Sequence, residues 1–282
     1  MLKKATKEEI EELKDSMYEM ALKPIQVSYP VYYDGIKTKE AFIKNAERAL
    51  NEENRELFLF ILEKVEGWIS YFWLEDDRYL QLECFVINHS IKQALAELLA
   101  YLEEKFKGYT LYFGFPFENQ EAIHYLSMQG FYNIEKSWNH SFFFDDYQSV
   151  EVDKHIERVT RENFALFKQI YHPDEETYWN CERIYAALDQ WIIFIYRQNE
   201  ECLGMVFLTE NNRCFEIFGM EFVNEVIKEK IYIPLMLAAL HECKQKEGKA
   251  LTYFCDEDEK KYLSQLGFKC IGQYLLYIKT IG

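Results

Sequence analysis

The chain has 282 residues, of which 49% are hydrophobic and 28% charged, a composition that can bury a core and excludes intrinsic disorder. Its 48 acidic and 32 basic residues give a formal net charge of −16, which excludes general binding to nucleic acid or anionic membranes, because both need a basic surface. The N-terminal region carries charges throughout, and the longest uncharged apolar run, 231–240, is too short to span a bilayer. The seven cysteines have no zinc-site spacing. We therefore expect a cytoplasmic protein with reduced thiols and no metal site.

The first half alternates between helical and strand patterns. Thr6 and Glu9 form a capping box that opens a helix, and Gly108 follows another helix as a C-terminal cap. The other elements follow from apolar spacing and from β-branched and aromatic content. In chain order, the expected elements are helices 7–22 and 39–51, strands 56–62, 67–75 and 79–87, helix 91–106, strand 110–115, helix 119–128 and strand 132–144.

The second half repeats this order after a short strand. Three consecutive strands with short turns must be antiparallel, and a strand–helix–strand step implies a parallel pair. The expected fold class is therefore α/β (α+β), with a mixed, mainly antiparallel sheet flanked by helices in each half. The expected elements are strand 155–159, helices 162–171 and 177–188, strands 191–197, 203–209 and 214–223, helix 226–243, strand 250–255, helix 257–265 and strand 269–279.

An internal repeat explains this shared order. The pattern Y-L-S-x-x-G-F occurs at 125–131 and again at 262–268, an offset of 137. Gly67 and Gly204 have the same offset, and we align 84–86 with 221–223 on that basis. Such self-similarity indicates duplicated units. We predict an N-terminal domain at 1–148 and a degenerate C-terminal domain at 149–282, with the boundary in the acidic run 145–154.

The organisation resembles the GNAT superfamily of acyl-CoA N-acyltransferases, in a tandem form. The resemblance rests on Asn119 and Ala122 at the start of a late helix, followed by Gly130-Phe131 before the last strand. It covers both halves. In that family the Asn lies beside the pantetheine arm of acetyl-CoA, so the resemblance implies acetyl-CoA as the co-substrate.

The same resemblance implies where the cofactor would bind. The family hydrogen-bonds pantetheine to a strand backbone and places the pyrophosphate at the following helix N-terminus, where free N–H groups and the helix dipole favour anions. In the second half, Ile231 and Ile233 stand where the family has small residues, so this half is degenerate. The candidate cofactor-binding residues are Phe85, Val86, Lys92, Ala94, Leu95, Ala96 and Asn119.

Two residues are candidates for acid–base chemistry. Strand alternation puts Glu83 on one face with Gln81 and Phe85, either as the base in the cleft or as a solvated strand residue. Its counterpart at the 137 offset is Met220. The family's acid Tyr falls at Leu126, and Tyr125 is one residue early. Tyr125 therefore either reaches the cleft as the acid or packs under the sheet.

These observations lead to two hypotheses about function. The first is an N-acetyltransferase that moves an acyl group from acyl-CoA to a small amine, with its activity in the N-terminal half. The acidic charge favours a cationic amine as partner, and no nucleic acid or membrane partner is expected. The second is a catalytically inactive GNAT-like binding or dimerisation module. A homodimer is compatible with both hypotheses.

Overall fold

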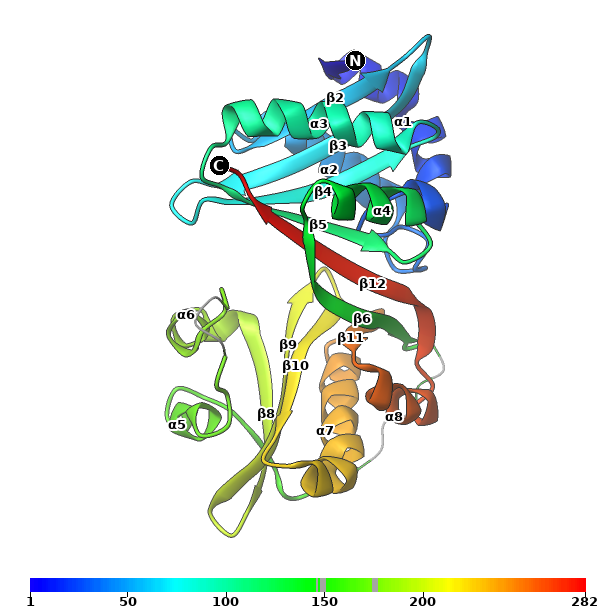
Figure 1. Cartoon of the computed structure of the whole chain (residues 1–282). Helices are drawn as coiled ribbons and strands as arrows, with labels where there is room; N and C mark the ends of the chain where they lie inside the picture. The colour runs from blue at the N-terminus through cyan, green and yellow to red at the C-terminus, as the bar shows by residue number, and fades with distance from the viewer. Residues whose placement is uncertain (146, 148–150, 174–176) are drawn as a thin grey trace. The chain divides into compact units, whose positions relative to one another are not determined.

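The computed structural model describes residues 1–145, 147, 151–173 and 177–282, which form two compact units (Figure 1). Unit 1 comprises Met1–Ser137 and Gly272–Gly282, and unit 2 comprises Trp138–Ile271. These units differ from the predicted domains 1–148 and 149–282, since each half gives its last strand to the other unit. The predicted boundary between residues 148 and 149 lies outside the described residues.

Unit 1 contains one sheet with strand order β1-β2-β3-β4-β5-β12. The pairs are antiparallel except for β4 and β5, which are parallel. Its elements are β1 (Leu2–Lys4), α1 (Lys7–Ala21), η1 (Pro24–Gln26), α2 (Lys39–Asn51), β2 (Arg55–Ile61), β3 (Val65–Leu74), β4 (Tyr79–Ile87), α3 (Ile91–Lys105), β5 (Thr110–Pro116), α4 (Gln120–Met128) and the C-terminal β12 (Lys269–Thr280).

Unit 2 has the corresponding order β6-β11-β10-β9-β8-β7, with β10 and β11 as its parallel pair. The mixed, mainly antiparallel sheets confirm the predicted fold class. The elements are β6 (Tyr132–Phe143), β7 (Ile156–Arg158), α5 (Phe164–Lys168), α6 (Cys181–Ala186), η2 (Leu188–Gln190), β8 (Trp191–Gln198), β9 (Glu201–Asn211), β10 (Cys214–Phe222), α7 (Glu225–Gln245), β11 (Ala250–Cys255), η3 (Glu257–Glu259) and α8 (Lys260–Gln265).

The last strands of the two halves are exchanged. Residues 138–143 of β6 pair with β11 in unit 2, from Trp138 opposite Cys255 to Phe143 opposite Ala250. Residues 274–280 of β12 pair with β5 in unit 1. The predicted domains 1–148 and 149–282 keep each last strand with its own half, whereas the pairing joins most of it to the other unit.

Helices cover both faces of each sheet (Figure 1). In unit 1, α3 and α4 pack on one face and bury Leu98, Leu102 and Leu126, while α2 packs on the other face with Phe42 stacked on Trp68. In unit 2, α7 and α8 cover one face and α5 and α6 the other. None of the seven cysteines, all of which lie in the described part of the chain, forms a disulfide. No helix among the described residues is long and apolar enough to cross a membrane.

Candidate functional site

In unit 1, β4 and β5 separate after a short paired stretch. They pair at Tyr79–Thr110 through Gln81–Tyr112, and the register with β3 then shifts so that Glu83 is the extra residue of a bulge. A bulge reverses the alternation of the residues that follow it. Phe85 consequently shares its core face with Leu82, so the prediction that Phe85 and Glu83 lie on one face was wrong.

The chain itself fills the gap between the separated strands. The Ser28 N–H donates to the Phe85 carbonyl at 3.0 Å, and the Phe85 N–H donates to Ser28 Oγ at 3.0 Å. On the other side, the Tyr29 N–H donates to the Gly114 carbonyl on β5 at 2.8 Å. Val27 forms a bridge with Val86. The backbone predicted to bind pantetheine is thus already hydrogen-bonded.

Two further predicted binding groups have internal partners. Asn119 is buried; its Oδ1 accepts from the Ala122 N–H, and its Nδ2 donates to the Val27 carbonyl at 3.1 Å. At the start of α3, the Lys92 N–H donates to Glu121 Oε1 at 3.1 Å. A carboxylate therefore already uses an N–H group that a phosphate would need.

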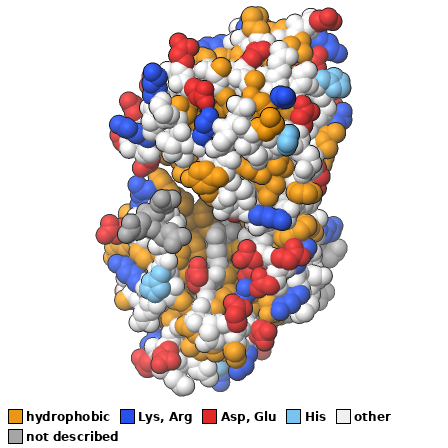
Figure 2. All heavy atoms as spheres, viewed as in Figure 1, with side chains coloured by type: hydrophobic (Ala, Val, Ile, Leu, Met, Phe, Trp, Pro, Cys, Tyr) orange, Lys and Arg blue, Asp and Glu red, His pale blue; other side chains and the backbone are white. Residues whose placement is uncertain are grey.

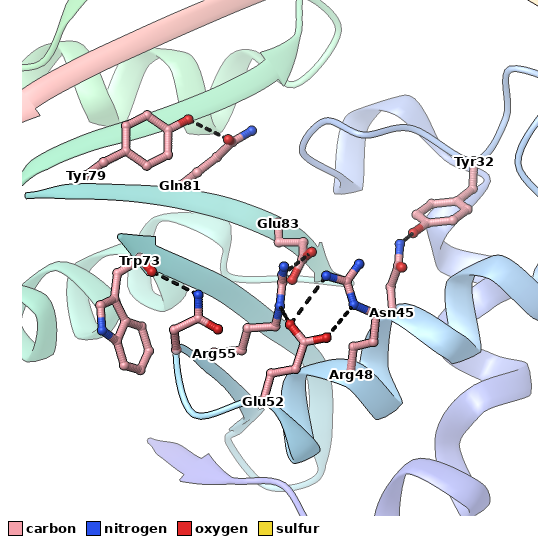
Figure 3. Close-up of polar contacts among 10 residues, drawn as sticks. Tyr32, Asn45, Arg48, Glu52, Arg55, Trp73, Tyr79, Gln81 and Glu83 are labelled. Atoms are coloured by element: carbon pink, nitrogen blue, oxygen red, sulfur yellow. Dashed lines mark hydrogen bonds and ion pairs between the residues drawn. The ribbon is translucent and has the colours of Figure 1, made fainter. Parts of the chain in front are cut away.

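Glu83 belongs to a chain of ion pairs. Its carboxylate contacts Arg55, and Glu52 lies between Arg55 and Arg48, at 2.6 Å and 2.9 Å (Figure 3). The Glu83 side chain is 13% exposed. It is therefore not a solvated strand residue. Its carboxylate is already paired with Arg55 within the protein, so a substrate ammonium would have to compete with this arginine.

The other predicted residues lie mainly in the core of unit 1. Tyr125 is buried in the cluster that includes Phe113 and Leu126, so it packs under the sheet. Ala94 and Leu95 are completely buried, and Ala96 is partly buried against the same cluster. The small residues at the start of α3 therefore serve close packing in this structure.

A separate pocket of about 380 Å³ in unit 1 contains none of the predicted site residues. Glu56 is buried beside it and accepts from Lys4 at 2.6 Å and from Tyr101 at 3.0 Å; it also pairs with Lys105 at 2.8 Å and accepts from the Tyr71 hydroxyl. These partners outweigh the cost of burial and lower the pKa of Glu56 to about 2. The pocket's two lysines are thus paired within the protein.

Unit 2 repeats the separation and the bulge with different side chains. β10 and β11 pair from Cys214–Ala250 to Ile217–Tyr253, and Phe218 is then the extra residue opposite β9. Phe218 is the counterpart of Glu83, 135 residues later, so the predicted counterpart Met220 was wrong. The hairpin before β10 is shorter than that before β4, which changes the offset.

The gap in unit 2 differs from that in unit 1 in its hydrogen bonding. Among the residues that the structure describes, no segment of unit 2 hydrogen-bonds to Met220 as Ser28 does to Phe85. The side chain of Glu221 points away from the α7 core, and Phe218 is 45% exposed and contacts Trp191. Desolvation and the negative charge of Glu259 raise the pKa of Glu221, against a smaller opposite effect of His172.

Acidic groups surround the start of α7. Lys228 pairs with Asp258 at 2.9 Å and with Glu259 at 3.4 Å. Asp256, which is the repeat counterpart of Asn119, forms a capping box with Glu259. Acidic side chains gather on the face of unit 2 that carries α8 (Figure 2). These charges disfavour a phosphate near Lys228.

Comparisons with solved structures decide the fold. A GCN5-related N-acetyltransferase from Sphaerobacter thermophilus is similar over 100% of this chain and 95% of its own, with a TM-score of 0.68 at 11% identity. A tandem GNAT protein from the clavulanic acid biosynthesis pathway is similar over 100% of this chain and 99% of its own, with a TM-score of 0.57 at 13% identity. The chain has a tandem GNAT fold.

Another structure with this fold is the glucosamine N-acetyltransferase region of a fungal multi-domain β-N-acetylglucosaminidase. The match covers 99% of this chain and 38% of the chain of the fungal protein, with a TM-score of 0.61 at 12% identity. No protein-family model matches the sequence, and no curated protein matches it significantly. The tandem GNAT fold is thus retained at low sequence identity.

The tandem GNAT fold implies acetyl-CoA, and the two units differ in how well their residues fit it. Unit 1 does not fit, because Ser28, Tyr29 and Glu121 use the groups that would bind it. These contacts argue against the predicted activity in the N-terminal half, which stays a prediction. Unit 2 retains an unbridged strand gap among its described residues, and β10 from Gly219 to Phe222 would hold the pantetheine arm. The start of α7 fits the phosphates less well, because Asp258 and Glu259 lie beside it and Asn224 uses the Ile227 N–H.

Sequence reasoning missed three residues of these sites. Ser28 and Glu121 lie far from their partners along the chain, and no periodicity indicates such contacts. Glu221 was not among the predicted site residues, because the bulge at Phe218 was not anticipated. The shorter hairpin at 211–214 was the available signal for the shifted alignment of β10.

Proposed function

We propose that the protein is an acyl-CoA-dependent N-acyltransferase for a small cationic amine, with its reaction centre in unit 2. The observation that carries this proposal is the bulge at Phe218, where β10 leaves β11 and no described segment takes its place. The N-acetyltransferases among the similar structures support the same class of reaction.

The acceptor side of this centre suits a cation. Glu221 supplies a carboxylate, and the residues Phe218 and Tyr178 are each 45% exposed, with the Arg183 guanidinium over the Tyr178 ring at 4.0 Å. Trp179 joins them through ring contacts to Tyr178 and Trp191. Aromatic faces attract ammonium groups, and a carboxylate adds a direct ionic contact.

Glu221 would act as the general base. It removes a proton from the substrate ammonium, and the free amine nitrogen then attacks the thioester carbonyl that acyl-CoA supplies when bound. The C–S bond breaks, the nitrogen loses its second proton as the amide forms, and the departing thiolate takes up that proton. The raised pKa of Glu221 brings it closer to neutral pH, where a carboxylate is a more effective proton acceptor.

Calorimetry with acetyl-CoA and a transfer assay with polyamines and aminoglycosides test this proposal. We expect saturable binding of acetyl-CoA and acetylation of at least one amine. Glu221→Gln should lower kcat about 100-fold, the usual size of a general-base contribution. The exposed Glu229 on α7 gives a matched control, since Glu229→Gln should leave kcat unchanged. Absence of acetyl-CoA binding at millimolar concentration would contradict the proposal.

A catalytically inactive binding module is the second candidate. It is favoured by the pairing of Lys228 with Asp258 and Glu259 and by the absence of small residues in the first turn of α7 (Glu225, Val226 and Ile227). The same calorimetry separates the two, because the second candidate requires that neither unit binds acetyl-CoA.

A further inference from the structure

Unit 1 holds a segment of its own chain where the resemblance places the cofactor. We propose that Gln26–Tyr29 is a built-in occupant of the gap between β4 and β5, which replaces acyl-CoA and closes unit 1 to it. This inference concerns unit 1 and is independent of the activity proposed for unit 2.

Ser28 pairs with β4 as a secondary amide of a ligand would. Its N–H donates to the Phe85 carbonyl, and its Oγ accepts from the N–H of the same residue, both at 3.0 Å. One residue therefore satisfies both the donor and the acceptor of Phe85. Since buried backbone groups need partners, the gap has no unpaired group at Phe85 for an incoming ligand.

The segment also spans the gap, since it binds the second strand and the side chains around it. The Tyr29 N–H donates to Gly114 on β5 at 2.8 Å, and Asn119 Nδ2 donates to the Val27 carbonyl at 3.1 Å. At the other end, Gln26 Nε2 donates to the Asn88 carbonyl at 2.8 Å. Strands, loop and late helix thus hold one continuous piece of chain.

The occupant is buried along its whole length. Val27 and Ser28 are each 2% exposed, and Tyr29 is 7% exposed. Tyr29 also packs edge-on against Tyr274 of β12, with ring centroids 4.7 Å apart. A ligand in this gap would have to expel the buried apolar side chains of Val27 and Tyr29 into water, which is unfavourable.

Glu121 takes the place of the cofactor's pyrophosphate at the start of α3. Its Oε1 accepts from the Lys92 N–H at 3.1 Å, so a carboxylate interacts with the positive end of the helix. A pyrophosphate at this place could not accept a hydrogen bond from the Lys92 N–H, because Glu121 already does. It would also lie beside the negative charge of Glu121. The occupant and Glu121 therefore exclude the two parts of the cofactor by separate means.

Hydrogen exchange on the full-length protein tests the proposal amide by amide. We expect slow exchange at Ser28, Tyr29 and Phe85 without ligand, and no change when millimolar acetyl-CoA is added. Rapid exchange at these three amides, or increased protection on adding acetyl-CoA, would overturn the proposal. A change confined to β10 would report binding in unit 2, so the proposed function is read out separately.

A variant checks the pairing of Ser28. Ser28→Ala removes the oxygen that accepts from Phe85, and we expect exchange at Phe85 to become at least tenfold faster. Ser127→Ala is the matched control, because Ser127 Oγ donates to the Ile123 carbonyl on α4, away from the gap. Unchanged exchange at Phe85 in Ser28→Ala would contradict the proposal. If Ser28→Ala does not fold, the ligand titration of the wild-type protein still decides between the outcomes.

Discussion

At the scale of single residues, glycines and buried charges show where the sheets tolerate no change. Gly67 and Gly204 occupy equivalent places in the two units, and each is required because a neighbouring strand or helix approaches closely. A Cβ on Gly67 would lie 1.9 Å from the Val86 carbonyl oxygen, and one on Gly204 would lie 2.7 Å from the Ile231 side chain. The repeat seen in the sequence thus reflects a repeated steric requirement.

Gly67→Ala should lower the free energy of unfolding by at least about 3 kcal/mol, because backbone must move to admit the methyl group. Denaturant unfolding followed by circular dichroism measures this loss. Gly272→Ala is the control, since its Cβ would be 3.7 Å from its nearest neighbour, Glu118, and its effect should stay below about 1 kcal/mol. Equal stability of the two variants would refute the steric argument.

Glu56 makes the stability of unit 1 depend on pH. Its pKa is lowered to about 2 in the folded protein, so its contribution is complete above its unfolded pKa and is lost as pH falls toward 2. Glu56→Gln should cost about 3 kcal/mol at neutral pH, because Lys4 and Lys105 lose their buried partner.

Thermal unfolding between neutral pH and pH 2 checks this prediction. The difference in stability between the wild type and Glu56→Gln should shrink as the pH falls. Glu52→Gln, which changes an exposed carboxylate in the same region, should cost less than about 1 kcal/mol at neutral pH. A difference that stays constant down to pH 2 would argue against an ionised Glu56.

At the scale of elements, the two long helices begin differently although they follow equivalent strands. α7 has an N-cap, Asn224, whose side chain accepts from the Ile227 N–H, whereas Ser90 before α3 makes no such bond and has a φ of 62°. α7 also has 21 residues, against 15 in α3. The duplicated element has thus diverged at its N-terminus, where the family's cofactor would bind.

Substitutions at these two caps should have different effects. Asn224→Ala should lower the free energy of unfolding by about 1 kcal/mol, because the Ile227 N–H loses its partner. Ser90→Gly should leave it unchanged or raise it by up to about 1 kcal/mol, because glycine adopts a positive φ without strain. Chemical denaturation of both variants measures the contrast, and a destabilised Ser90→Gly would show that the Ser90 side chain has a role beyond its backbone conformation.

At the scale of the whole molecule, neither half of the sequence forms a complete unit. Unit 1 needs residues 272–282, and unit 2 needs residues 138–143 from the first half. β12 covers β5 along its length, from Tyr274 opposite Pro116 to Thr280 opposite Thr110. The two units therefore depend on one another through the chain.

A chain that ends at Ile271 should lose hydrogen-exchange protection along β5, because β5 then becomes an unpaired edge. The unfolding temperature of unit 1 should fall as well. Deletion of Gly282 alone is the control, since no atom lies within 4 Å of a Cβ built there. Full protection of β5 in the truncated chain would mean that β12 is dispensable.

The sequence by itself determined the duplication, the fold class and most of the elements, though not the strand β1 or the short extent of α6, because apolar periods, caps such as Thr6, and the Y-L-S-x-x-G-F pattern are local properties. It also pointed to Asn119 and to the strand containing Phe85. Only the tertiary structure decided that Val27 and Ser28 bind those groups and that the final strands are exchanged. Hydrogen bonds between segments far apart in the chain leave no periodic signal, and a bulge such as that at Glu83 changes which face each later residue occupies.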